Sequence, residues 1–321
     1  MAGKAWSKEL PPAQFAKLFE EHGAAKLARM LGIRERGVYD RRVRAEKYLR
    51  RQLVPPRTRC GSGSVRTGIE HPGRLTHEIQ NGTVLVGSDC HYWPGPPSLM
   101  HRAFVHFCKE LKPSLVVLNG DVMDFGGISR HPPIGWTRQP EVHEEIEAAQ
   151  GRVGEIEKAS FKARKVWCLG NHDGRFETYL ATRVPEYAKV RGTSLKDHFS
   201  LWEPCWGVWV NDVVIKHRFK GGKYAPDNNT LYAGKTIITG HLHAAQISPL
   251  SDYNGTRWGV DTGCIADPNH RAFLDYTEDN PKNWRDAFCI LTFRNSQLMC
   301  PELVTRWSDK EVQFRGTVIK V

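Results

Sequence analysis

Residues 166–173 read VWCLGNHD, a short apolar run that turns at a glycine and continues into an amide, an imidazole and a carboxylate. Related patterns recur in residues 84–91 (VLVGSDCH), 115–121 (LVVLNGD), 213–217 (VVIKH) and 236–243 (TIITGHLH). Short apolar runs bounded by turn residues predict buried strands. Because open α/β sheets bind ligands beyond the carboxyl ends of their strands, we expect these polar side chains to gather along one edge.

Helical patterns lie between the first three of these strands. One helix is expected around residues 101–111 and another around 141–160, and strands that alternate with helices predict a parallel sheet. Later strand-like segments, including 288–293, follow one another through short turns, which predicts a second, mostly antiparallel sheet. We also expect a hairpin at Asn81-Gly82, because this dipeptide suits a tight turn with φ > 0.

Seven side chains at the strand ends are candidate metal ligands. Residues two apart in a strand point to the same side, so Asp89 with His91, and His241 with His243, can each present two ligands together. The set mixes imidazole, carboxylate and amide oxygen, which suits Mn, Fe, Zn or Ni. Seven ligands are too many for one ion, and two ions about 3.5 to 4 Å apart need a shared carboxylate. We expect Asp121 to be that bridge, in a set of Asp89, His91, Asp121, Asn171, His217, His241 and His243.

The motifs D-x-H, G-D, G-N-H-D, a lone His and G-H-x-H, in this order, resemble those of the calcineurin-like metallophosphoesterases over residues 83–265. The resemblance implies an α/β fold, a four-layered α/β/β/α sandwich, with two divalent metal ions, manganese being preferred over iron, zinc or nickel. It implies Asp89, His91, Asp121 and His243 at one ion, and Asp121, Asn171, His217 and His241 at the other.

The resemblance also implies catalytic roles beside the metals. His172 would face the substrate phosphate and help to protonate the leaving oxygen, Asp173 would orient His172, and a metal-bound hydroxide would be the nucleophile. Two departures stand out. His217 is followed by Arg218, where the family often has glycine. The segment after Asp121 lacks the G-D-x-x-D-R-G motif of serine/threonine phosphatases, so we disfavour that activity.

The positive charge of the chain is concentrated near its N-terminus. Residues 1–59 hold 15 Lys and Arg against 6 Asp and Glu, a net +9 of the total +11. Apolar spacing predicts two helices before Gly32 and a third over residues 35–49, which is helix-turn-helix organisation. We expect the third helix to dock in the major groove of DNA, although a solvated basic surface is the plainer alternative. The candidate DNA contacts are Arg34, Arg36, Arg41, Arg42, Arg44 and Lys47.

Composition divides the chain into three segments. We predict a small all-α, helix-turn-helix-like basic domain over residues 1–51, a flexible Pro, Gly and Ser-rich linker over 52–73, and the metallophosphoesterase domain over 74–321. The eight Cys contain no C-x-x-C pair, and no apolar stretch approaches the roughly 18 residues of a membrane span. We therefore expect a cytoplasmic protein, in the host cytoplasm if a phage encodes it, with no membrane partner. The oligomeric state stays open.

These features favour a metal-dependent phosphodiesterase that acts on DNA as a nuclease, with the N-terminal domain holding the substrate. Two alternatives remain. One is a small-molecule phosphomonoesterase or cyclic-nucleotide phosphodiesterase, and the other is a non-catalytic DNA-binding regulator. The aromatic group Trp202, Trp206 and Trp209 is interpreted as packing between sheets rather than as a base-stacking platform.

Overall fold

The computed structural model of the chain describes residues 10–54, 70–131, 135–136, 138–270, 273–274, 277–278, 280 and 282–321. Backbone contacts divide the chain into two compact units, Met1–Ser64 and Val65–Val321, and each is described by itself. Most of the expected linker, residues 55–69, lies outside the described residues.

The described part of the N-terminal unit is a small all-α module. Helix α1 (Pro12–Leu31) is interrupted at Gly23, whose backbone is non-helical with φ 71° and ψ 170°, and it ends at Gly32 in the left-handed conformation. Helix α2 (Glu35–Leu49) follows after a short turn. The apolar spacing predicted from the sequence corresponds to a buried core of Phe15, Ala16, Phe19, Leu27, Ala28, Leu31, Val38, Ala45 and Leu53. The structure thus confirms the helical module, whereas its binding of DNA stays a prediction.

The larger sheet of the second unit is parallel at its centre. Its parallel strands lie in the order β2 (Gly82–Gly87), β3 (Leu115–Leu118), β4 (Arg164–Cys168) and β5 (Glu203–Cys205). On the other side of β2 the sheet continues with antiparallel strands, in the order β11 (Ala287–Arg294), β13 (Glu302–Arg306), β14 (Glu311–Phe314) and β15 (Thr317–Lys320), with β12 (Gln297–Leu298) paired to β11.

The smaller sheet has a mixed topology. Its order is β1 (Leu75–His77), β6 (Val208–Val210), β7 (Val213–Ile215), β8 (Thr236–Thr239), β10 (Gly255–Asp261) and β9 (Gln246–Asp252). Only the β6–β7 and β9–β10 pairs are antiparallel, so the expectation of a mostly antiparallel sheet was wrong. The hairpin at Asn81-Gly82 was also wrong. Strand β1 pairs with β6 whereas β2 pairs with β3 and β11, so the chain crosses between the two sheets at this dipeptide.

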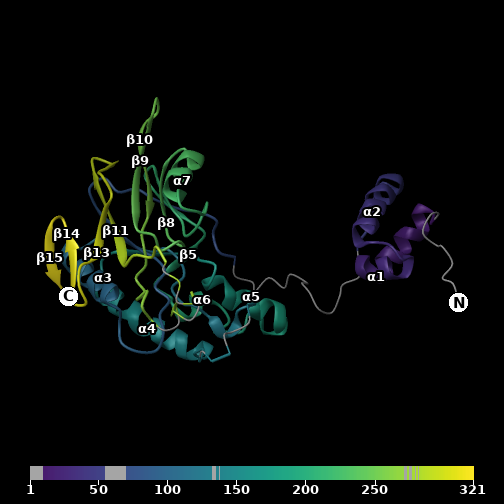
Figure 1. Cartoon of the computed structure of the whole chain (residues 1–321), viewed down its shortest axis with the longest axis horizontal. Helices are drawn as coiled ribbons and strands as arrows, with labels where there is room; N and C mark the ends of the chain where they lie inside the picture. The colour runs from purple at the N-terminus through teal and green to yellow at the C-terminus, as the bar shows by residue number, and fades with distance from the viewer. Residues whose placement is uncertain are drawn as a thin grey trace. The chain divides into compact units, whose positions relative to one another are not determined.

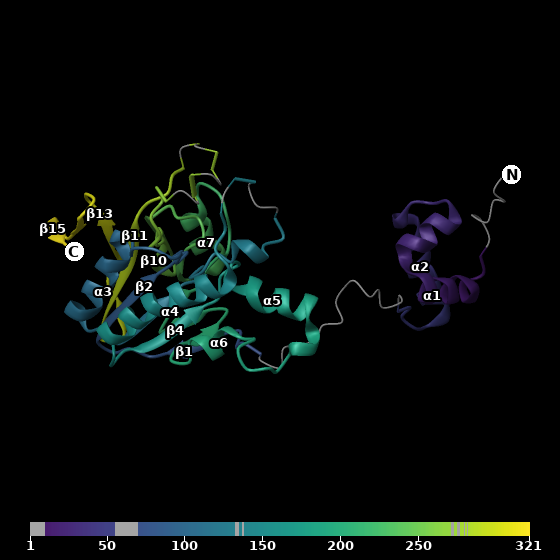
Figure 2. The same ribbon diagram turned by 90° about the horizontal axis from the view of Figure 1, so that it is seen from below.

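Helices cover the outer faces of the two sheets. Alternate residues of β2 point to opposite sides: Val84 and Val86 join the core between the sheets, and Leu85 joins the core beneath the helices. Helices α3 (Leu99–Leu111) and α4 (Val142–Ala159) contribute to that second core, and α7 (Ala225–Ala233) packs on β8, β9 and β10 (Figures 1 and 2). The predicted α/β/β/α sandwich is confirmed.

Four short elements complete the described structure, and they include α5, which borders the site below. They are η1 (Gly126–Ile128), α5 (Asp173–Arg183), η2 (Pro185–Tyr187) and α6 (Leu195–His198). Within the described ranges, none of the helices has both the length and the apolar content needed to cross a membrane.

Candidate metal centre

All seven predicted ligands lie in loops beyond the ends of strands, and the loops hold an unusual backbone. Asp89, His91, Asp121, His241 and His243 have φ values of 53°, 40°, 51°, 74° and 59°, which is the left-handed region that non-glycine residues rarely adopt. The predicted pairing of Asp89 with His91 through strand alternation was therefore wrong in its mechanism. Loop geometry brings these side chains together, and such strain persists only where the surrounding structure enforces it.

Backbone hydrogen bonds between the loops supply that enforcement. The N–H of Asp89 donates to the carbonyl of Gly120 at 2.9 Å, and the N–H of His91 donates to the carbonyl of Asp121 at 3.0 Å. The N–H of Gly240 donates to the carbonyl of His217 at 2.9 Å. Loops that follow different strands are thus joined directly, which fixes the ligands relative to one another.

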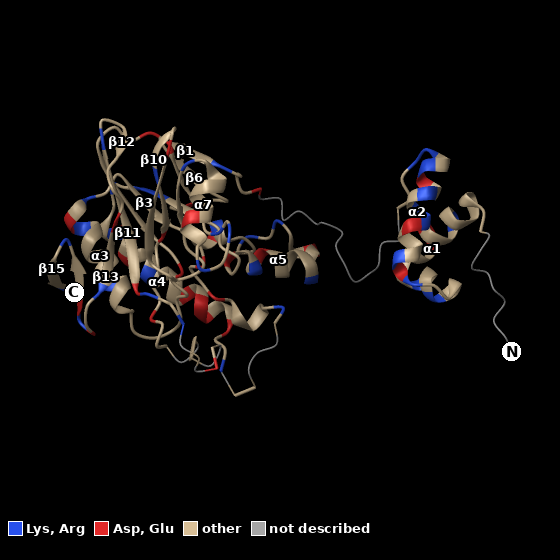
Figure 3. Ribbon diagram, turned by 45° about the horizontal axis from the view of Figure 1, so that its top comes forward, with Lys and Arg blue, Asp and Glu red and all other residues tan. Residues whose placement is uncertain are grey.

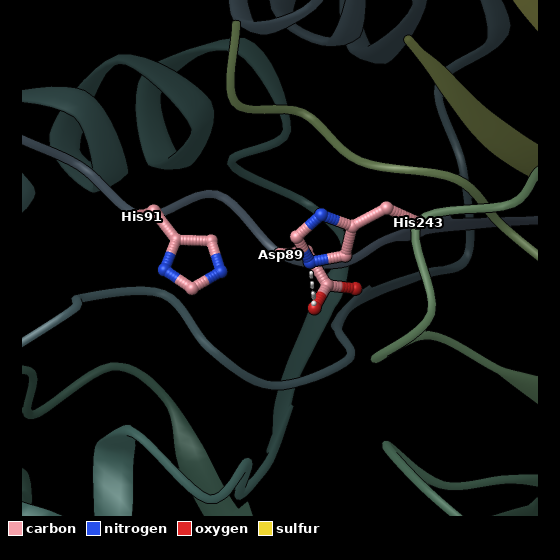
Figure 4. Close-up of side chains that lie close together, drawn as sticks. All are labelled: Asp89, His91 and His243. Carbon is pink, nitrogen blue, oxygen red and sulfur yellow. Dashed lines mark hydrogen bonds and ion pairs between the residues drawn. The ribbon is translucent and has the colours of Figure 1, made fainter. Parts of the chain in front are cut away.

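Asp89, His91 and His243 form the first group of candidate ligands (Figure 4). All three are buried, and their ligand atoms lie within 4.8 Å of one another. His243 Nε2 lies 3.0 Å from Asp89 Oδ1. Burial opposes ionisation of Asp89, but the charges of His243 and His217 lower the pKa of Asp89 to about 2. The carboxylate is therefore charged at neutral pH, as a metal ligand must be.

Asp121, His217 and His241 form the second group. His217 Nδ1 lies 2.8 Å from the carbonyl of Asn119, and this contact assigns the ring proton to Nδ1 and leaves a lone pair on Nε2. His217 Nε2 lies 3.1 Å from Asp121 Oδ2, yet it is buried and has no partner with hydrogen-bond geometry among the described residues. Two electron-pair donors this close repel each other unless a cation lies between them.

The electrostatics of the second group favour a bound cation. Burial alone would lower the pKa of His217, but the charges of Asp121 and Asp89 raise it to about 10. The two carboxylates thus attract positive charge strongly enough to protonate this imidazole when no metal is present. Asn171 adds a buried side-chain oxygen, Oδ1, that has no hydrogen-bonding partner within the described part of the chain. These residues fit divalent metal ions of the kind that bind imidazole, carboxylate and amide ligands.

Glycines at three loop positions make room for the ligands. A Cβ atom added at Gly170 would lie 2.8 Å from Asp121 Cγ, and one at Gly120 would lie 2.7 Å from His217 Cβ. One added at Gly240 would lie 2.6 Å from Asp89 Oδ2. Real Cβ atoms essentially never approach other heavy atoms within 3.0 Å, so a larger residue at any of these positions would displace a ligand.

His172 lies beside both groups, and the carboxylate that contacts its ring is that of Asp124. His172 Nδ1 is 2.7 Å from Asp124 Oδ1, and the same Asp124 oxygen is 3.3 Å from His91 Nδ1. The N–H of Asp124 donates to Glu145 of α4 at 3.0 Å, which anchors the loop. Burial would lower the pKa of His172, but the contact with Asp124 raises it, which favours the protonated imidazole. Sequence reasoning missed Asp124, whose available signal was its position three residues after Asp121.

Asp173 does not have the contact predicted for it, because both of its oxygens are used elsewhere. Oδ2 accepts the N–H groups of Asp121 at 2.9 Å and Gly170 at 2.8 Å, together with the indole N–H of Trp167 at 3.0 Å. Oδ1 accepts the N–H of Val122 at 2.9 Å. Asp173 therefore holds the loops that carry Asp121 and Asn171, and the carboxylate beside the His172 ring is Asp124 rather than Asp173, for which the resemblance implied that position.

Helix α2 of the N-terminal module carries Lys and Arg at several positions (Figure 3), and the candidate DNA contacts differ in their burial. Arg34, Arg36, Arg44 and Lys47 are exposed, and Arg41 is half-buried. Arg42 instead serves the module's own fold. Its Nε donates to Glu46 at 2.8 Å, its guanidinium lies 5.3 Å from the ring centre of Phe19, and Glu46 also accepts the N–H of Leu53. Arg42 remains partly exposed, so its role as a DNA contact stays a prediction.

The three tryptophans expected in the core have separate environments. Trp202 is buried beneath the helices, and Trp209 is half-buried with the guanidinium of Arg74 3.9 Å from its ring centre. Trp206 is 54% exposed, because it lies in the turn between β5 and β6, outside both sheets. The interpretation of Trp206 as a core residue was wrong.

The calcineurin-like phosphoesterase family matches residues 82–255, which is more than half of the chain and includes all seven candidate ligands. No curated protein matches the chain. Among solved structures, it is similar to zinc-complexed Vps29 from Entamoeba histolytica, at 13% identity and a TM-score of 0.40, covering 74% of this chain and 98% of that one. It is also similar to Chaetomium thermophilum Vps29, at 10% identity and a TM-score of 0.38, covering 74% of this chain and 96% of that one. The match to residues 82–255 shows that the chain belongs to the calcineurin-like phosphoesterase family.

Proposed function

We propose that the chain hydrolyses phosphodiester bonds in DNA with the help of two divalent metal ions, manganese being the preferred ion over iron, zinc or nickel. The observation that carries the proposal is the pair of ligand groups, Asp89 with His91 and His243, and Asp121 with His217 and His241. In the second group Asp121 Oδ2 faces the lone pair of His217 Nε2 at 3.1 Å. Asn171 adds a buried Oδ1 that has no hydrogen-bonding partner among the described residues.

Two divalent cations held by these residues would lower the pKa of water and neutralise the charge of the phosphoryl oxygens. In the reaction, the attacking water loses one proton to solvent, its oxygen forms a bond to phosphorus, and the bond from phosphorus to the leaving oxygen breaks. His172 donates its proton to that leaving oxygen. Asp124 holds the imidazole through Nδ1, at 2.7 Å, so that Nε2 is the nitrogen that can face the substrate.

The N-terminal module supports DNA as the substrate. Arg36, Tyr39, Val43, Arg44 and Lys47 are exposed on α2 and follow the i, i+3, i+7, i+8, i+11 spacing of one helix face. Cations on such a face pair with phosphates or guanine, and exposed apolar groups meet thymine methyls in the major groove. Tyr39 and Val43 are exposed on the same face as these cations, so they are available for such contacts, which supports a binding face.

One assay separates this proposal from its rivals. Purified full-length protein with Mn²⁺ is offered linear duplex DNA, single-stranded DNA, bis-p-nitrophenyl phosphate and p-nitrophenyl phosphate. We expect hydrolysis of DNA and of the diester. Hydrolysis of the monoester alone would replace the nuclease with a phosphomonoesterase, and hydrolysis of the small diester but not of DNA would favour a cyclic-nucleotide phosphodiesterase. DNA binding without turnover, with any of the four metals, would favour a non-catalytic regulator.

A further inference from the structure

A cavity of about 800 Å³ adjoins the metal centre. At one end it is lined by the ligands Asn171 and His217, and from there it extends along α5. Its described lining contains no Asp or Glu, whereas five cationic residues contribute to its wall: Arg130, Arg175, Arg183, Lys216 and Arg218. The cavity therefore continues away from the metal ligands as a positively charged surface.

Helix α5 presents one complete face to this cavity. Residues 175, 178, 179, 182 and 183 line it, and their spacing of i, i+3, i+4, i+7 and i+8 places them on one side of the helix. Phe176 lies on the other side and joins the core beneath the helices. The face toward the cavity consists of two arginines, two threonines and a tyrosine, so apolar packing does not explain it.

Except for Arg175, whose Nη1 lies 3.9 Å from Asp124 Oδ1, the cations of the cavity wall form no ion pair with a described carboxylate. Within the described residues, Arg130, Arg183 and Arg218 are exposed and form no ion pair with Asp or Glu. Arg175 differs, because its Nη1 donates to the carbonyl of Asp124 at 2.8 Å, which fixes it near His172. Like charges gathered in one cavity repel each other, so this arrangement is favourable only when an anion occupies it.

Two aromatic side chains stand among these cations. Trp206 is 54% exposed and Tyr179 is 40% exposed, and both line the cavity. Trp206 comes from the turn between β5 and β6, whereas Tyr179 comes from α5, so the two aromatic side chains belong to separate elements. Aromatic faces beside a cationic track are the arrangement on which nucleic-acid bases stack while phosphates bind the cations.

We propose that this cavity binds a single-stranded segment of nucleic acid that leads away from the metal centre. The phosphates lie against Arg183 and Arg218, and the bases stack on Trp206 and Tyr179. The cavity volume is within the roughly 300 to 1,000 Å³ typical of sites for nucleotide-sized ligands, which suits one unpaired strand better than a double helix. This inference rests on the proposed phosphodiesterase function and specifies its substrate as a single-stranded end or flap.

The test compares two substrates on the full-length protein with Mn²⁺: an eight-nucleotide oligothymidylate and bis-p-nitrophenyl phosphate. The variants are Trp206→Ala and Arg183→Ala. Matched controls are Trp307→Ala, at 60% exposure, and Arg294→Ala, also exposed, neither of which lines the cavity. The ratio of kcat/KM for the oligonucleotide to that for the small diester is the main readout.

Trp206→Ala should lower this ratio by roughly tenfold, because one stacked base contributes about that much to binding. For Arg183→Ala, the slope of log(kcat/KM) for the oligonucleotide against log salt concentration should become shallower by about 0.7, the value for one contact to a single strand. The two control variants should match the wild type in both measurements.

If the wild type cleaves the oligonucleotide and both cavity variants keep the wild-type ratio and slope, the cavity proposal is overturned and the proposed function stands. If the wild type cleaves nothing, the proposed function fails, and fluorescence anisotropy of the labelled oligonucleotide decides the cavity proposal: roughly tenfold weaker binding by Trp206→Ala supports it, and unchanged binding overturns it. The cavity proposal would also be overturned if the cavity variants lost as much kcat/KM on a blunt duplex as on the oligonucleotide, or lost more on a phosphoserine peptide.

Discussion

Gly170→Ala is the substitution for which the structure predicts the sharpest effect. The added Cβ would lie 2.8 Å from Asp121 Cγ and closer still to Asp121 Oδ1 and the Asp121 backbone N, where ordinary contacts begin at 3.4 Å. The Asp121 carboxylate must therefore retreat by at least about 0.6 Å at Cγ. Misplacing a reacting group by about 1 Å can cost 100-fold in rate, so we expect kcat/KM to fall roughly 10- to 100-fold.

The same crowding should affect metal binding and stability. Overfilling a packed site costs about 1–3 kcal/mol of unfolding free energy. Isothermal titration with Mn²⁺ measures the metal affinity, and urea titration followed by circular dichroism measures the stability of the metal-free protein. Gly174→Ala is the matched control, because a Cβ there meets nothing within 4 Å and the residue lies inside α5. Alanine in a helix should raise stability by roughly 0.5–1 kcal/mol, with the Mn²⁺ affinity unchanged.

Wild-type Mn²⁺ affinity in Gly170→Ala would contradict the predicted displacement of the Asp121 ligand, because it would mean that Asp121 can move without leaving the metal centre. A loss of Mn²⁺ affinity in Gly174→Ala equal to that in Gly170→Ala would refute it too, since a general disturbance of α5 would then explain both variants.

Three further predictions concern the catalytic carboxylates and the N-terminal module. Asp121→Asn should abolish hydrolysis of bis-p-nitrophenyl phosphate with an unchanged circular dichroism spectrum, and a variant that keeps a tenth of the activity would rule out the bridging role. Asp124→Asn should lower the pKa of His172, measured by NMR, because the carboxylate that raises this pKa is removed. The same variant should lower kcat roughly 10- to 100-fold, since a hydrogen bond to a charged group contributes about 1.5–3 kcal/mol. An unchanged His172 titration would exclude the pairing. Deleting residues 1–51 should weaken DNA binding and its salt dependence while sparing small-diester hydrolysis, and equal salt slopes for both proteins would contradict the DNA-binding role.

Local patterns in the sequence were sufficient to predict the α/β core and the gathering of the ligands, whereas the four-layered sandwich followed from the resemblance to the metallophosphoesterases. Apolar runs that end in Asp, His or Asn predict strands whose ends meet at one edge, and the two ligand groups contain six of the seven predicted ligands. The loop backbone that brings these ligands together was not predictable from the sequence. The left-handed backbone at Asp89 and His241 is held by hydrogen bonds between loops far apart in sequence, and no local pattern specifies those bonds.

Other details depend on tertiary structure alone. Asn81-Gly82 has the local chemistry of a hairpin turn, but pairing of β1 with the other sheet overrides it. Asp124 and Asp173 both lie close to ligands in the sequence, and only the packed loops show that Asp124 reaches His172 while Asp173 faces backbone N–H groups. Trp206 is as apolar as Trp202, and its exposure follows from its place in a turn.

We propose that two metal ions share Asp121 as a ligand in one centre. Electron paramagnetic resonance of the full-length protein, loaded with two equivalents of Mn²⁺ and freed of excess metal, tests it most directly. We expect two Mn²⁺ per chain with an exchange-coupled spectrum, and loss of the coupling in Asp121→Asn. One Mn²⁺ per chain, or two with the uncoupled spectrum of isolated ions, would contradict it.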